Sequence, residues 1–68
     1  MAKMTLKAAR VNVDLSQKDA ASALGVSNKT LGNWESGLSF PKADQIVSIC
    51  NLYRVSYDDL IFLPSNSL

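Results

Sequence analysis

The 68-residue chain contains no histidine and only one cysteine, two prolines and three glycines. Because Cys50 is the single cysteine, the chain cannot form an internal disulfide, and nothing points to secretion. The lack of histidine, of a phosphate-binding glycine loop and of a nucleophile beside a base argues against an enzyme. No apolar run reaches the length of a membrane span, and the N-terminus has no signal-peptide pattern. We therefore expect a cytoplasmic, non-enzymatic protein without metal, cofactor or small-molecule ligand.

The chain does contain enough apolar residues, 47% of the total, to build one small core in a single domain. Its net charge is only +1, but the charges are unevenly distributed. Residues 1–42 carry six cationic and three anionic side chains, whereas residues 43–68 carry one cationic and three anionic side chains. A polyanion would therefore bind the N-terminal part of the chain more favourably than the C-terminal part.

An apolar residue followed by serine opens three similar segments, at residues 15–20, 26–31 and 55–60. Each serine can accept a hydrogen bond from an amide of a first helical turn, and in the first and third segments an aspartate can reach back. Together with the helical spacing of the apolar residues, these signals predict an all-α fold, a compact five-helix bundle. Four of the predicted helices span about residues 5–12, 17–24, 28–36 and 57–62. The remaining one, the fourth along the chain, has Pro41 in its first turn.

Local signals also predict where helices end and which residues are buried. Gly25 and Gly37 are expected to end the second and third helices in the left-handed conformation. Residues 63–68 are expected to be a frayed tail. Trp34 is expected in the core, and so is an apolar stripe on the fourth helix formed by Ala43, Ile46, Val47, Ile49, Cys50 and Tyr53.

The predicted helix at residues 28–36 has two faces. At about 100° per residue, Leu31 and Trp34 point to one side, and a polar set points to the other. Asparagine can bond an adenine edge in two places, and lysine can donate to guanine. Glycine within a helix costs about 1 kcal/mol relative to alanine, which a close approach to another surface would explain. On these residues alone, a solvated polar face is an equal alternative. The polar set is Asn28, Lys29, Gly32, Asn33 and Ser36.

The segment resembles the helix-turn-helix of phage repressor and Cro-type bacterial regulators. The resemblance covers about residues 6–62 and implies a lambda repressor-like DNA-binding domain at residues 1–68, with the helix-turn-helix at about 16–36. It implies a transcriptional regulator, in the form of a repressor, that binds a double-stranded DNA operator with an inverted repeat as a weak homodimer near the nucleoid. The matching features are Leu15-Ser16-Gln17, Ala21, Gly25-Val26-Ser27, Leu31, Trp34-Glu35, Gly37, Pro41 and Val55-Ser56 before Leu60.

The resemblance also implies roles for individual residues. Asn28, Lys29 and Asn33 match the positions that read base edges. Gln17 matches the glutamine that fixes the phosphate backbone and often braces the base-reading helix. Arg10 and Glu35 match a structural ion pair, although two independently solvated charges are the alternative. Further backbone or accessory contacts are implied for Arg10, Ser27, Thr30, Gly32, Ser36 and Lys42.

The loop after Gly37 departs from the family, which often carries lysine or arginine there. Here the loop reads Leu38-Ser39-Phe40, so Leu38 and Phe40 become candidates for a dimer contact, with packing of Phe40 on the fourth helix as the alternative. A second function stays open: a protein-interaction module on the same scaffold, such as an antitoxin or a partner-binding adaptor. The polar face of the third helix favours DNA, because protein-binding faces usually carry aromatic or aliphatic anchors.

Overall fold

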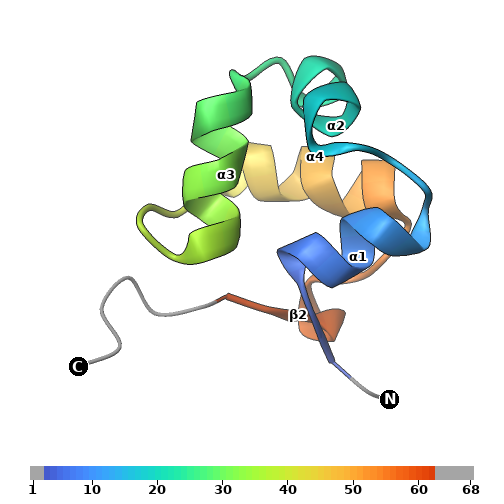
Figure 1. Ribbon diagram of the computed structural model, residues 1–68. Helices are drawn as coiled ribbons and strands as arrows, with labels where there is room; N and C mark the ends of the chain where they lie inside the picture. Colours follow the sequence, from blue (N-terminus) through green and yellow to red (C-terminus); the bar gives the residue numbers. More distant parts are fainter. Residues whose placement is uncertain (1–2, 63–68) are drawn as a thin grey trace.

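The computed structural model describes residues 3–62, in which four α-helices and one very short sheet enclose a common core (Figure 1). None of the helices in these residues is long and apolar enough to cross a membrane. The helices are α1 (Leu6–Asn12), α2 (Gln17–Leu24), α3 (Asn28–Ser36) and α4 (Ala43–Tyr53). A single 3₁₀ turn, η1 (Tyr57–Asp59), follows α4, and the two strands are β1 (Met4–Thr5) and β2 (Leu60–Ile61).

The starts and ends of α2 and α3 agree with the sequence prediction. The Ser16 hydroxyl accepts a hydrogen bond from the Asp19 amide at 3.0 Å, and the Ser27 hydroxyl accepts one from the Thr30 amide at 3.0 Å. Gly25 follows α2 with φ +75°, a conformation that residues with a Cβ rarely adopt. The sharp turn between the two helices is therefore a local property of the sequence.

The predicted fifth helix is wrong. Only Tyr57–Asp59 form a helical turn, and the chain then pairs as β2 in parallel with β1, with Leu60 opposite Met4. The Asp59 carboxylate accepts hydrogen bonds from the Ser56 amide at 3.3 Å and hydroxyl at 3.0 Å, which completes a single turn. Leu60 is buried in the core, and its backbone finds a partner at the opposite end of the chain. The predicted frayed tail, residues 63–68, lies outside the described residues.

The fourth helix begins later than predicted. Pro41 was expected in its first turn, but α4 begins at Ala43, with Lys42 as its N-cap residue. The Lys42 amide donates to Oε1 of Gln45 at 2.7 Å, so a glutamine side chain satisfies the cap. Lysine is not a usual N-cap residue, and for that reason sequence signals placed the start too early.

The core joins all four helices and β2. Trp34, at 5% exposure, is part of it as predicted, and the small side chains of Ala20 and Ala21 let α3 cross close to α2. On α4 the prediction is only half right, because Ile49 and Tyr53 are buried but Val47 is 60% exposed. The buried hydrophobic residues are Leu6, Ala9, Ala20, Ala21, Leu31, Trp34, Ile49, Tyr53 and Leu60.

Tyr53 makes the stability of this core sensitive to alkaline pH. Its side chain is buried, and its hydroxyl has no hydrogen-bond partner among residues 3–62. Burial, assisted by the Glu35 carboxylate, raises the pKa of Tyr53 from 10 to about 12. An unfolded chain ionises this phenol near pH 10, and the folded chain does so only near pH 12. The free energy of unfolding should therefore be undiminished below pH 10 and fall between pH 10 and 12.

We predict that Tyr53→Phe reduces this alkaline loss and leaves stability at pH 7 equal to or higher than that of the wild type, because it removes a buried hydroxyl without a partner. Urea denaturation from pH 8 to 12 measures both effects. Tyr57→Phe, at a tyrosine that is 58% exposed, is the matched control and should follow the wild type. If Tyr53→Phe and the wild type lost stability equally at alkaline pH, Tyr53 would not be the group responsible.

Candidate nucleic-acid interface

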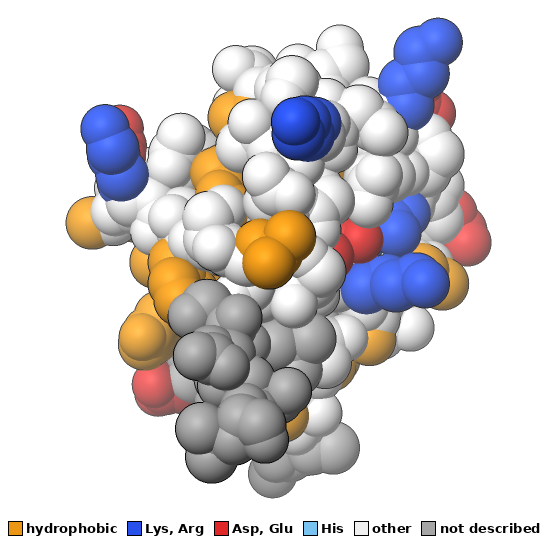
Figure 2. Space-filling view, turned by 60° about the vertical axis from the view of Figure 1, so that its left-hand side comes forward, with side chains coloured by type: hydrophobic (Ala, Val, Ile, Leu, Met, Phe, Trp, Pro, Cys, Tyr) orange, Lys and Arg blue, Asp and Glu red, His pale blue; other side chains and the backbone are white. Residues whose placement is uncertain are grey.

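Helix α3 lies at the outside of the molecule, beside α2 and in front of α4 (Figure 1). Leu31 and Trp34 fix its inner side in the core. On its outer side Asn28 and Lys29 are exposed, and Asn33, one turn further along, is partly buried. Figure 2 turns the α3 side forward and shows a mostly uncharged surface on which Lys and Arg side chains stand at separate places. A DNA backbone would therefore meet few cations here.

A buried ion pair connects α1 to α3. Nε of Arg10 lies 2.7 Å from Oε2 of Glu35, and the two side chains are only 9% and 7% exposed. The hydrogen bond to Glu35 raises the pKa of the Arg10 guanidinium, which therefore stays protonated. A further guanidinium nitrogen donates to the carbonyl oxygen of Leu15 at 2.8 Å. Since these bonds bury Arg10, little of its surface is left for the DNA phosphate contact that the family resemblance implied.

The ion pair continues into a chain of side-chain hydrogen bonds through Gln17. Nε2 of Gln17 donates to Oε1 of Glu35 at 3.1 Å. Oε1 of the same glutamine accepts from Nδ2 of Asn28 at 3.1 Å. Thus one glutamine, at the first position of α2, connects the buried carboxylate to a candidate base-reading side chain at the first position of α3.

Gly32 lies directly beneath this glutamine. A Cβ placed on Gly32 would lie 3.6 Å from both Nε2 and Oε1 of Gln17, which is ordinary van der Waals contact. The sequence suggested that Gly32 allows close approach to another surface. Within the protein, the nearest side chain is the Gln17 amide, and it leaves room for a Cβ, so no contact inside the protein requires glycine at this position.

The accessory candidates already have partners within the protein. The Ser27 hydroxyl donates to Oγ1 of Thr30 at 2.9 Å, and the Ser36 hydroxyl donates to the Asn33 carbonyl at 3.2 Å. The Lys42 side chain is exposed, but its amide donates to Gln45. The Lys42 amide at the start of α4 is therefore already paired within the protein.

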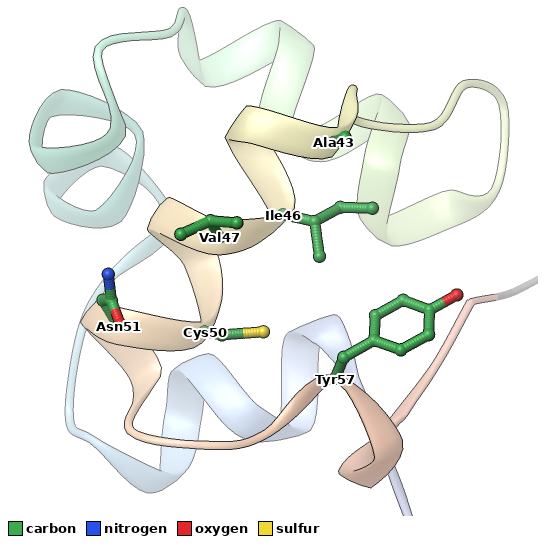
Figure 3. A pocket seen from close by; sticks show the side chains of 6 residues that line it. All are labelled: Ala43, Ile46, Val47, Cys50, Asn51 and Tyr57. Atoms are coloured by element: carbon green, nitrogen blue, oxygen red, sulfur yellow. The ribbon is translucent and has the colours of Figure 1, made fainter.

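A second, apolar surface lies between α4 and η1. In Figure 3, the Ile46 side chain and the Cys50 thiol of α4 point toward the Tyr57 ring of η1, across an open hollow of about 510 Å³. Burial raises the pKa of the Cys50 thiol. We call this hollow the α4 groove; its lining residues are Ala43, Ile46, Val47, Cys50, Asn51 and Tyr57. Sequence reasoning missed the groove because it assigned the apolar stripe of this helix to the core.

The loop between α3 and α4 adds further exposed apolar surface. Leu38 is 67% exposed and Phe40 is 52% exposed, so about half of Phe40 remains accessible. Within residues 3–62 no group of histidine, cysteine, aspartate and glutamate side chains could hold a metal ion.

Comparisons with known proteins match this arrangement. A helix-turn-helix family profile matches residues 6–60. The HTH-type transcriptional regulator ImmR of Bacillus subtilis (strain 168) is 39% identical over 56 residues, which are 82% of this chain and 44% of that protein. The antitoxin PezA of Streptococcus pneumoniae serotype 4 is 34% identical over 56 residues, 82% of this chain and 35% of that protein. The matched segment thus covers less than half the length of either relative. The chain belongs to the helix-turn-helix family, as its resemblance to phage repressor and Cro-type regulators predicted.

Proposed function

We propose that this chain binds double-stranded DNA sequence-specifically and regulates transcription, as a repressor. The observation that carries the proposal is the division of α3 into two faces. Leu31 and Trp34 hold the helix in the core, and the opposite side offers amides and one ammonium group without an apolar anchor. Membership of the helix-turn-helix family supports this function, and so does the regulator named among its relatives. The proposed function is binding alone, with no enzymatic step, cofactor or metal.

In this proposal α3 enters the major groove with its N-terminal end foremost. Asn28 and Lys29 contact base edges there, and Asn33 does so one turn later. Gln17 contacts the phosphate backbone at the start of α2. Accessory contacts come from the hydroxyl groups of Ser27, Thr30 and Ser36, which have lone pairs left to accept hydrogen bonds. The exposed ammonium group of Lys42, at the N-cap of α4, adds another.

We predict that Asn28→Ala, Lys29→Ala and Asn33→Ala each weaken operator binding by about 1–3 kcal/mol and relax specificity at particular base pairs, because each removes a base contact. Gln17→Ala should weaken binding to all sequences, because it removes a contact to the phosphate backbone. Selection from a random DNA pool followed by binding titrations measures both. Asn51→Ala, an exposed asparagine on α4, is the control and should bind like the wild type. A folded triple variant that binds the selected operator as tightly as the wild type would refute the proposal.

Gly32→Ala separates stability from binding. We predict that it stabilises the free protein by up to about 1 kcal/mol, because alanine favours the helix and its methyl group makes only ordinary contact with Gln17. The same methyl group lies on the face that meets DNA, so the affinity for the operator should fall. Thermal denaturation and binding titrations test the two parts. Ser48→Ala on the exposed side of α4 is the control for helix propensity and should leave affinity unchanged. Unaltered affinity of Gly32→Ala would contradict a close approach to DNA.

We further propose a weak homodimer on an inverted repeat, with half-sites about one helical turn apart. The exposure of Leu38 and Phe40, in the loop that follows α3, supports a contact between two copies near the symmetry axis. Burial of these side chains would offset the small number of phosphate-binding cations.

We predict that the double variant Leu38→Ser/Phe40→Ser loses cooperative binding to the full inverted repeat but retains wild-type affinity for an isolated half-site. Binding titrations on full-site and half-site DNA, with sedimentation of the complexes, measure this. Equal cooperativity in the variant and the wild type would place the dimer contact elsewhere.

A protein-interaction module is the second candidate, and the α4 groove is the observation that favours it. Val47 and Tyr57 are 60% and 58% exposed at its edge, an arrangement that suits an apolar segment of a partner. A relative that is named an antitoxin points in the same direction. If the folded protein enriches no sequence from a random DNA pool, this candidate replaces the first.

A further inference from the structure

We propose that Glu35, whose side chain does not form part of the outer face of α3, determines which base Asn28 binds. It would do so as a positioning residue, by fixing the orientation of two amide side chains in succession. The inference rests on the proposed DNA-binding function and deepens it, because it names the residue that sets specificity at one base pair. Its physical basis is the chain of hydrogen bonds from Arg10 through Glu35 and Gln17 to Asn28.

The first step follows from the hydrogen-bonding capacity of a carboxylate. An ionised carboxylate can only accept hydrogen bonds, and a guanidinium can only donate them. Arg10 holds Oε2 of Glu35 at 2.7 Å and contacts Oε1 at 3.3 Å. The Gln17 atom that faces Oε1 must therefore be the amino nitrogen, which lies 3.1 Å away. Because the side chains of Arg10 and Glu35 are buried, solvent does not compete strongly with this arrangement.

The second step transfers this orientation to α3. With its amino group toward Glu35, Gln17 turns its carbonyl oxygen toward Asn28 and accepts a hydrogen bond from Nδ2 at 3.1 Å. Asn28 is thereby left with its carbonyl oxygen and its second N–H for a ligand. A reversed Gln17 would instead hold the carbonyl oxygen of Asn28 and leave the two N–H donors of its amide for the ligand.

These two orientations match different bases. In the major groove adenine presents one donor and one acceptor, N6 and N7, whereas guanine presents two acceptors, O6 and N7. The observed orientation of Asn28, with one acceptor and one donor remaining, complements adenine. The reversed orientation, with two donors remaining, would complement guanine. Glu35 therefore favours adenine at the base pair that Asn28 contacts, although it does not contact DNA itself.

The test is Glu35→Gln. In this variant the new side-chain amide must turn its carbonyl oxygen toward Arg10, which can only donate, so its amino group faces Gln17. Gln17 must then turn its carbonyl oxygen toward position 35 and its amino group toward Asn28, and Asn28 reverses in response. We expect preference at the Asn28 base pair to shift from adenine toward guanine by about tenfold or more, with other base pairs unchanged. Random-pool selection with the wild type, Asn28→Ala and Glu35→Gln measures this, since the profile of Asn28→Ala identifies the base pair concerned.

A second variant covers the case in which Glu35→Gln fails to fold. Arg10→Met/Glu35→Leu replaces the buried pair by apolar side chains, an exchange that proteins often tolerate. Gln17 then has no fixed orientation, so discrimination between adenine and guanine should be lost at the same base pair only. A uniform loss of affinity at all base pairs, with the preference for adenine retained, would show that the ion pair is merely structural and would overturn the inference.

A readout on the free protein keeps this inference separate from the proposed function. In Glu35→Gln the side-chain amide resonances of Gln17 and Asn28 should shift in ¹⁵N–¹H spectra, whereas those of Asn51 on α4 should not. Unchanged resonances of Gln17 and Asn28 would overturn the inference even if the protein binds DNA. If the resonances shift but the wild type enriches no DNA sequence, the proposed function fails, and the specificity role of Glu35 fails with it.

Discussion

The structure depends most on the buried ion pair between Arg10 and Glu35. Moving two charges out of water costs several kcal/mol per ion, and only close geometry with additional hydrogen bonds offsets that cost. Here the pair is short, and the guanidinium also donates to the Leu15 carbonyl oxygen. The bonds therefore tie α1, the segment before α2, and α3 into one relative arrangement. A displacement of α3 would leave a buried charge without a partner, so the pair specifies the orientation of the helix that carries the polar face.

Packing and polarity then divide α3 between two tasks. Small side chains on α2 allow the two helices to cross closely, while Leu31 and Trp34 bury the inner side of α3. The outer side is free to present amides and one lysine. Few cations surround it, so in the proposed complex shape, amide contacts and Gln17 would contribute more to DNA binding than bulk charge. Specificity in such a protein depends on the orientation of a few polar side chains.

Features governed by neighbouring residues could be predicted from the sequence. Ser16, Ser27 and Gly25 act within one turn of their own positions, and for that reason the bounds of α2 and α3 were correct. The pairing of β2 with β1 joins residues that are far apart in the sequence. Local spacing cannot reveal such a pairing, and it predicted a helix at residues 57–62 instead. The α4 groove was missed because an apolar stripe does not reveal whether another element covers it. The bonds from Gln17 to Glu35 and Asn28 join two elements, α2 and α3, and only the assembled positions of these helices disclose the partners.

The central claim is that the outer face of α3 reads a DNA sequence. Selection of binding sites from a random double-stranded pool by the wild-type protein tests it most directly, because it reports specificity, symmetry and half-site spacing together. The account predicts enrichment of an inverted repeat with half-sites about one helical turn apart. Failure of the folded protein to enrich any sequence would contradict it.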